Sequence, residues 1–103
     1  MIKINIRPLS VNNAWKGKRF KTYDYKQYEK DLGLLLPKDI KVKNGLQLEF
    51  GFSSKLSDID NPVKPFIDIL QKKYGFNDRD LTLLNIKKEN VKKGEEYIKF
   101  MFI

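Results

Sequence analysis

Apolar side chains alternate with polar ones in two stretches of the chain, which is the pattern of a β-strand with one buried face. The first stretch covers residues 2–6 and stops before Pro8. The second covers residues 46–52 and follows an Asn-Gly turn signal at residues 44–45. Both stretches are therefore predicted to be strands with one face on the core. Residues 9–21, which lie between Pro8 and the first helical pattern, are predicted to form a loop.

A spacing of three and four residues predicts two helices. Thr22 is a suitable N-cap for the first, which ends before Pro37. The apolar side chains expected on its buried face are Tyr25, Tyr28, Leu32 and Leu35. Those expected on the buried face of the second helix are Val63, Phe66, Ile67, Leu70 and Tyr74. Gly75 is expected to end this second helix.

The start of the second helix depends on two prolines. Pro62 suits a first helical position. Pro65, however, disfavours helical geometry at the residue before it. The expected start therefore moves to Pro65, with residues 60–64 as an irregular approach.

Two more strands are predicted at about residues 81–91 and 96–102, joined by a turn at residues 92–95. They are expected to form a terminal hairpin. The order of elements is then strand, helix, strand, helix, strand, strand. This order predicts the α+β class, as a two-layer domain in which two helices pack on a small mixed sheet. The length of 103 residues fits one domain, residues 1–103.

Charge and composition limit the kinds of partner and of catalytic site that this chain can have. Lys and Arg number 21 against 13 acids, for a formal net charge of +8, which favours a polyanionic partner. The chain contains no Cys and no His, which excludes disulfides, zinc-thiolate sites, thiol nucleophiles and catalytic triads with an imidazole base. No apolar run is long enough to cross a membrane, and no signal peptide is recognisable, so we expect a cytoplasmic protein.

Five carboxylates fall between Asp58 and Asp80 in this basic chain. In an extended segment Asp58 and Asp60 project to the same side, where they repel each other unless a cation or a proton intervenes. Lys64 follows four residues after Asp60 and precedes Asp68 by four. This pattern suits a divalent ion held next to a phosphate. Two simpler interpretations remain open: a capping and turn cluster for the two acids, and a helix-surface ion pair for the lysine.

The complete motif set is more specific than the acid pair. It consists of Asp58-x-Asp60-Asn61-x-x-Lys64-x-x-x-Asp68-x-Leu70, then Gly75-x-x-Asp78, preceded by Pro8-Leu9-Ser10-Val11-Asn12-x-x-Trp15. Together these motifs resemble the RusA family of Holliday junction resolvases. The resemblance implies a homodimer that binds a four-way DNA junction and cuts two opposed strands with Mg²⁺ or Mn²⁺. It implies no small-molecule cofactor.

The resemblance also implies roles for individual residues. In this family three aspartates bind the metal and a lysine takes part in catalysis. By motif the first two aspartates correspond to Asp58 and Asp60, and the third to Asp78. The lysine corresponds to Lys64. Family members usually carry a paired Asp-Asp at the third-ligand position, whereas this chain has Asn77 before Asp78. Asp80 is a second candidate for the third ligand.

A basic cluster in the loop is the expected DNA contact, because basic residues bracket the aromatic residues Trp15 and Phe20. Its members are Asn12, Lys16, Lys18, Arg19 and Lys21. The alternative is a solvated loop in which Trp15 anchors the core. A second basic stretch on the expected terminal hairpin either extends this surface or protects an edge strand from aggregation. Its members are Lys87, Lys88, Lys92 and Lys93.

The function expected from these observations is metal-dependent hydrolysis of phosphodiesters in a four-way junction. In that reaction the ion polarises the phosphate and activates water, and Lys64 stabilises the charged transition state. Three alternatives stay open. One is a non-catalytic module that binds branched DNA selectively, and another is a nuclease of the same chemistry that acts on flaps or other branched DNA. The third is a phage accessory protein that binds a host protein and has lost activity.

Overall fold

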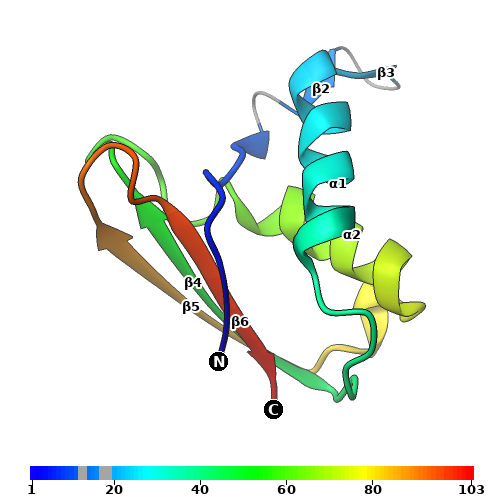
Figure 1. The fold of residues 1–103 in the computed structure, drawn as a ribbon. Coiled ribbons are helices and arrows are strands. Elements are labelled where there is room, and N and C mark those ends of the chain that lie inside the picture. Colours follow the sequence, from blue (N-terminus) through cyan, green and yellow to red (C-terminus); the bar gives the residue numbers. More distant parts are fainter. Residues whose placement is uncertain (12–13, 17–19) are drawn as a thin grey trace.

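Two helices cover one face of a four-stranded mixed sheet in the computed structural model (Figure 1). The structure describes residues 1–11, 14–16 and 20–103, with the backbone alone for residues 15, 16 and 20. The sheet order is β1 (Ile2–Ile4), β6 (Tyr97–Phe102), β4 (Gly45–Phe52) and β5 (Leu83–Asn90). Strands β4 and β5 are parallel, and the other two pairs are antiparallel. The predicted α+β class and two-layer arrangement are confirmed.

The core lies between the sheet and the helices. Alternate residues of β4 face it, as predicted from the sequence: Leu46, Leu48, Phe50 and Phe52 are all buried. Strand β6 contributes Ile98, Phe100 and Phe102 from the neighbouring position in the register. Phe66 packs between two of these strands, with its ring edge-on to Phe50 and to Phe100. The period-two pattern therefore identified the buried face of the sheet correctly.

Helix α1 (Tyr23–Leu35) begins where the sequence indicated. The Thr22 side chain accepts a hydrogen bond of 3.1 Å from the Tyr25 backbone amide, which is the expected N-cap. Tyr25, Tyr28 and Leu32 are buried. Leu35 is not, and the prediction that it belongs to the buried face was wrong. The chain leaves the helix at Leu36, and this residue turns into the core instead.

Helix α2 (Val63–Tyr74) starts two residues earlier than predicted. Pro62 occupies the N-cap position in helical geometry, and Pro65 is the third helical residue. The first-turn amides of a helix have no partner within the helix, so the amide that Pro65 lacks costs nothing there. Gly75 ends the helix with φ of 70°, a left-handed conformation that glycine adopts without strain. The predicted end of the helix is confirmed.

The two final strands do not form a hairpin, so that prediction was wrong. Strand β4 lies between them and pairs with both. The predicted turn at residues 92–95 is present, with Gly94 at φ of 94° and a hydrogen bond of 2.9 Å from the Glu95 amide to the Lys92 carbonyl. Because β5 runs parallel to β4, the chain has to cross the end of β4 before it returns as β6.

Three short elements were not predicted. The segment expected to be an irregular loop contains a small antiparallel pair, β2 (Trp15–Lys16) and β3 (Phe20–Lys21), next to the start of α1 (Figure 1). A single turn of 3-10 helix, η2 (Asp78–Asp80), follows α2. Within the described residues, no helix has both the length and the apolar character needed to span a bilayer.

Candidate active site

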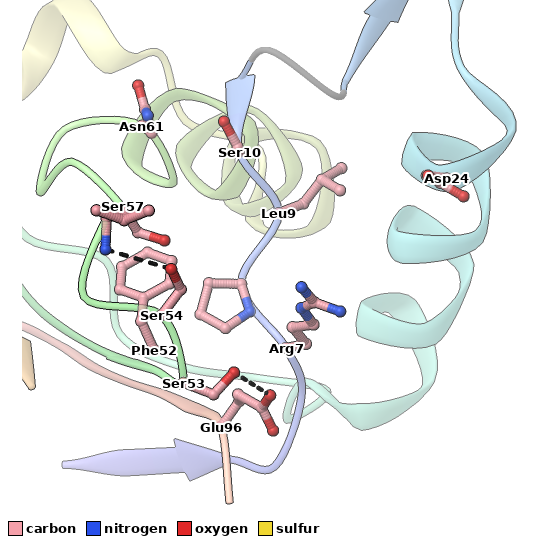
Figure 2. Close-up of a pocket in the computed structure, with 12 residues that line it drawn as sticks. Arg7, Leu9, Ser10, Asp24, Phe52, Ser53, Ser54, Ser57, Asn61 and Glu96 are labelled. Atoms are coloured by element: carbon pink, nitrogen blue, oxygen red, sulfur yellow. Dashed lines mark hydrogen bonds between the residues drawn. The ribbon is translucent and has the colours of Figure 1, made fainter. Parts of the chain in front are cut away.

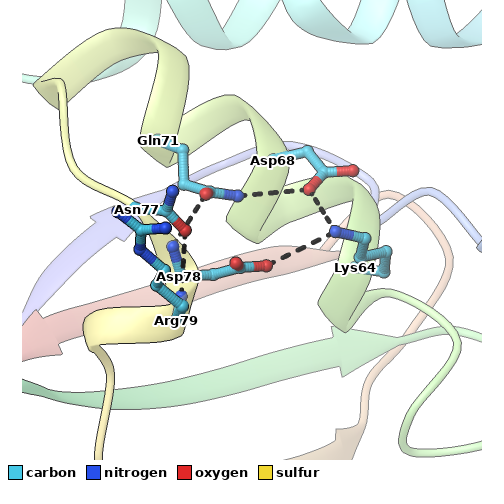
Figure 3. Close-up of polar contacts among 6 residues, drawn as sticks. All are labelled: Lys64, Asp68, Gln71, Asn77, Asp78 and Arg79. Carbon is cyan, nitrogen blue, oxygen red and sulfur yellow. Dashed lines mark hydrogen bonds and ion pairs between the residues drawn. The ribbon is translucent and has the colours of Figure 1, made fainter.

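Lys64 stands between two carboxylates at the N-terminal part of α2 (Figure 3). Its ammonium lies 2.7 Å from Asp68 Oδ1, one helical turn further on. It also lies 3.4 Å from Asp78 Oδ2, which belongs to η2. The helix-surface ion pair of Lys64 with Asp68, which was the simpler interpretation of this lysine, is therefore present. The fold adds a second acid from a segment that follows the helix.

Gln71 connects the two acids. Its side-chain oxygen accepts a hydrogen bond of 2.8 Å from the Asp78 backbone amide. Its side-chain nitrogen donates to Asp68 Oδ1 over 3.2 Å. One glutamine thus fixes the loop that carries Asp78 against the helix that carries Lys64, as the dashed lines in Figure 3 show. Sequence reasoning missed this residue, although its position three residues after Asp68 places it on the same helix face.

The two carboxylates determine the charge state of the lysine. The hydrogen bond to Asp68 is the largest effect and raises the pKa of Lys64 above its ordinary value, with a smaller contribution from Asp78. Lys64 is therefore a cation throughout the physiological range. With 59% of its side chain exposed, the ammonium remains accessible to a phosphate. It suits charge stabilisation and is unsuited to act as a general base.

Asp58 and Asp60 lie on the loop between β4 and α2, and both are exposed. The loop bends back on itself: the Asn61 amide donates to the Asp58 carbonyl over 3.3 Å, and the Val63 amide donates to the Asp60 carbonyl over 3.2 Å. Neither carboxylate takes part in a recorded ion pair or hydrogen bond within the described chain. Both therefore have oxygen atoms available for a cation or for solvent.

The donor atoms fit a hard cation but do not form a complete cage. In residues 1–11, 14–16 and 20–103, no three carboxylates stand close enough together to hold a metal ion. Asp78, the predicted third ligand, has Lys64 as its neighbour instead. Mg²⁺, however, is commonly held by one or two carboxylates, with water and substrate phosphate completing its shell. The exposed pair Asp58 and Asp60 matches that smaller requirement.

Asp80 and Asn77 occupy the same short helical turn as Asp78. The Asn77 side chain accepts a hydrogen bond of 3.1 Å from the Arg79 amide and caps η2. Asparagine and aspartate are both good caps, so either residue would serve as the cap at position 77. Asp80 is exposed, and its carboxylate has no recorded partner among the described residues.

The two motif segments meet in space although about fifty residues separate them. The Val11 amide donates a hydrogen bond of 2.8 Å to the carbonyl of Asn61, which follows Asp60 directly. From the opposite side, the Lys88 ammonium donates to the carbonyl of Ser57, directly before Asp58. We call residues 58–60 the acidic turn and residues 7–11 the N-terminal segment. Strand β5 and the N-terminal segment therefore hold the two ends of the acidic turn. Lys88 was predicted only as part of a basic stretch, and its role as an anchor requires the folded structure.

The structure describes the predicted DNA-contacting residues only in part. Asn12, Lys18 and Arg19 lie outside the described residues, and of Lys16 only the backbone is described. Lys21 is paired inside the protein, 3.0 Å from Glu29 of α1. Of the second basic stretch, Lys87 pairs with Glu89 on its own strand at 2.9 Å.

A cleft of about 530 Å³ borders the acidic turn (Figure 2). Three segments supply most of its lining: residues 7–10 after β1, the loop after β4, and Asn61 before α2. The carboxylates of Asp24 in α1 and of Glu96 before β6 also line it. Its wall is rich in hydroxyl groups, with Ser53, Ser54 and Ser57 on the loop and Ser10 on the N-terminal segment. We call this feature the serine cleft.

The chain matches no model of a known protein family, and no curated protein matches its sequence.

Proposed function

We propose that this protein is a metal-dependent endonuclease that cuts branched DNA, with a four-way junction as its substrate. The observation that carries the proposal is the convergence of the motif segments. The Val11 amide binds the carbonyl of Asn61, and Lys64 contacts the Asp78 carboxylate that follows the same helix. Residues of three motif segments thus meet near the start of α2, where Val11 contacts Asn61 and Asp78 contacts Lys64. The net charge of +8 supports a polyanionic substrate.

In this proposal Asp58 and Asp60 hold a Mg²⁺ or Mn²⁺ ion. Their carboxylates are exposed and have no competing cation within the described chain. The chemistry that such an ion supplies is polarisation of the scissile phosphate and activation of water. With no histidine in the chain, the imidazole base of many nucleases is not available for this purpose.

Lys64 is proposed to neutralise charge on the phosphate. Its raised pKa keeps it protonated, and its exposure leaves the ammonium accessible from solvent. Asp68 holds this ammonium at 2.7 Å and fixes its direction. Fixed charges of this kind stabilise a transition state without reorganisation. The resemblance implies Asp78 as the third metal ligand, with Asp80 as the second candidate, although the carboxylate of Asp78 contacts Lys64 in this structure.

The proposal includes a homodimer, because two equal sites suit a junction with two-fold symmetry. Each protomer then cuts one of two opposed strands. The basic cluster of residues 12–21 is proposed to bind the DNA backbone.

The test is cleavage of a labelled synthetic four-way junction with Mg²⁺ or Mn²⁺, alongside linear duplex and flap substrates. We expect paired symmetric nicks in the junction alone, and a dimer by light scattering. Asp60→Asn should abolish cleavage and preserve junction binding, whereas Asp39→Asn, an exposed aspartate after α1, should leave both unchanged. Cleavage of the flap in preference to the junction would assign the same chemistry to a different substrate.

One observation favours a second function, that of a non-catalytic module that binds branched DNA. The described residues contain no group of three acids near enough to share a metal ion. A binding module would associate with the junction equally well in EDTA and would not cut it in either metal. That result would refute the proposal of an enzyme.

A further inference from the structure

The serine cleft has the chemistry of a nucleic-acid strand site. Ser54 and Ser57 present hydroxyls and Asn61 presents an amide, all of which donate hydrogen bonds to phosphate or sugar oxygens. The volume of about 530 Å³ lies in the range of ordinary ligand sites. Neutral donors make up most of the polar lining, and the charged groups are Arg7, Asp24 and Glu96. The part of the cleft that carries the neutral donors suits a ligand with many acceptor oxygens along its length.

The cleft and the candidate active site share one loop. Ser57 and Asn61 line the cleft, and they are the residues that flank the acidic turn directly. Val11 and Lys88 hold the backbone of those same two residues in place. A strand in the cleft therefore passes beside Asp58 and Asp60.

Arg7 supplies a positive charge further along the cleft. Figure 2 shows the loop serines and Asn61 on one side of residues 8–10, and the Arg7 guanidinium on the other. Arg7 is exposed and has no recorded ion pair within the described chain. The nearby Glu96 is already occupied, because it accepts hydrogen bonds from Ser53 and from the Gly94 amide at 2.8 Å each. The charge of Arg7 still acts on Glu96 electrostatically. Because no ion pair holds the guanidinium, its donors can reach a phosphate.

The rim of the cleft is apolar at one point. Leu56 is 92% exposed at the tip of the loop, and Leu9 is half-buried in the opposite wall. Leucine side chains of this kind pack against nucleobases in proteins that separate or kink a DNA strand. Hydroxyl donors and a cation can contact the phosphate and sugar of a nucleotide, and an apolar edge can contact its base.

We infer that the serine cleft binds a short segment of one DNA strand next to the cleavage position, with its backbone on Arg7 and the loop hydroxyls and a base against Leu56. This inference rests on the proposed function, because it states where the DNA strand that is to be cut lies on the protein. It assigns Arg7, Ser54 and Leu56 to substrate binding, although none of them belongs to the acidic motif or to the basic cluster.

The absence of native cysteine allows a direct test, because an introduced thiol is the only one in the chain. Leu56→Cys places it on the cleft, and Leu34→Cys places it on α1 at a site that is also strongly exposed, at 80%. We expect four-way junction DNA, in EDTA to prevent cleavage, to slow alkylation of Leu56→Cys several-fold and to leave Leu34→Cys unchanged. Equal rates with and without bound DNA at position 56 would overturn the inference.

Arg7 gives a second, independent measurement. Arg7→Gln should weaken junction binding and lower the slope of log K against log salt by about one, since each phosphate contact releases roughly 0.7–0.9 of a counterion. Arg7→Lys should retain the slope. An unchanged slope in Arg7→Gln would show that the guanidinium does not contact a phosphate of the bound strand.

The outcomes separate this inference from the function on which it rests. Cleavage without protection of position 56 refutes the cleft and leaves the nuclease intact. Protection at position 56 without cleavage in either metal supports the cleft and refutes the enzyme. Failure to bind junction DNA at all refutes both.

Discussion

Gln71 is the residue on which the arrangement of the candidate active site depends most directly. Its side chain accepts from the Asp78 amide at 2.8 Å and donates to Asp68 at 3.2 Å. Methionine has a similar length and volume but can make neither hydrogen bond. Gln71→Met should therefore leave the backbone of Asp78 without this partner and release the loop at residues 75–80 from α2.

The size of the effect follows from these two contacts. An intramolecular hydrogen bond contributes about 0.5–1.5 kcal/mol net, and more where the partner is charged. Gln71 and Asp78 are only half-buried, so water replaces part of what is lost. We expect Gln71→Met to lower the free energy of unfolding by about 1–2 kcal/mol. For a small protein this is a fall of roughly 0.5–1 M in the urea midpoint.

A matched control exists on the other helix. Gln27 also donates to an aspartate on its own helix, Asp31, at 2.9 Å, but this pair is exposed and joins no second element. Gln27→Met should cost only about 0.2–0.5 kcal/mol. Both variants are compared by urea unfolding and by the rate of junction cleavage at saturating protein. Only Gln71→Met should slow cleavage, because only Gln71 fixes the position of the loop that carries Asp78.

A third variant separates the two contacts. Gln71→Glu keeps an acceptor for the Asp78 amide and places a second carboxylate against Asp68. It should hold the loop better than Gln71→Met and should disturb the Lys64 contact more. Equal urea midpoints for Gln71→Met and Gln27→Met would refute the reasoning, since they would show that the loop does not depend on this side chain.

Other parts of the fold give three further predictions. Burial raises the pKa of Glu29, but hydrogen bonds from Lys21 and Lys72 outweigh burial, so the pKa in the folded protein is lower than the ordinary value of 4.5. The ion pairs of Glu29 should therefore stabilise the fold fully above pH 4.5. This stabilisation should be lost as the pH falls through the lower pKa of the folded state. Glu29→Gln should therefore lower unfolding stability by about 1 kcal/mol at neutral pH and by nothing in strong acid, measured by urea unfolding at both. Gly51→Ala would place a methyl 2.5 Å from the Tyr97 ring, so we expect a loss of about 1–3 kcal/mol in thermal unfolding, and an unchanged melting point would show that the ring moves freely. Phe66→Ala removes a fully buried ring and should cost about 3–5 kcal/mol in the same assay; a loss below about 1 kcal/mol would contradict the packing described.

The hydrophobic pattern predicted the elements well where the signal is local. Thr22 and Gly75 mark helix ends through hydrogen bonds and backbone geometry that depend on a few neighbouring residues. The alternation over residues 46–52 identified a buried strand face because successive side chains of a strand point to opposite sides. Two of the predictions that failed concern the ends of helices. Leu35 follows the helical period, but the chain leaves the helix at Leu36, which is buried instead.

The hydrophobic pattern did not indicate which strands pair with one another. A turn at residues 92–95 is compatible with a hairpin and equally with a crossing over a neighbouring strand. The choice depends on the parallel pairing of β5 with β4, which is a contact between distant segments. The small pair β2 and β3 was missed for a related reason, since strands of two residues are too short to show alternation.

For the candidate active site, the sequence by itself determined which side chains of α2 are neighbours in space. Residues four apart in one helix lie on the same face, one turn from each other. It predicted the contact of Lys64 with Asp68 in this way. Only the tertiary structure decided that Asp78 approaches the same lysine, that Gln71 holds it there, and that Val11 and Lys88 fix the acidic turn. These contacts join segments that the chain separates by seven to fifty residues. Such contacts form only when the packing of α2 on the sheet brings the loops at its two ends together with the N-terminal segment.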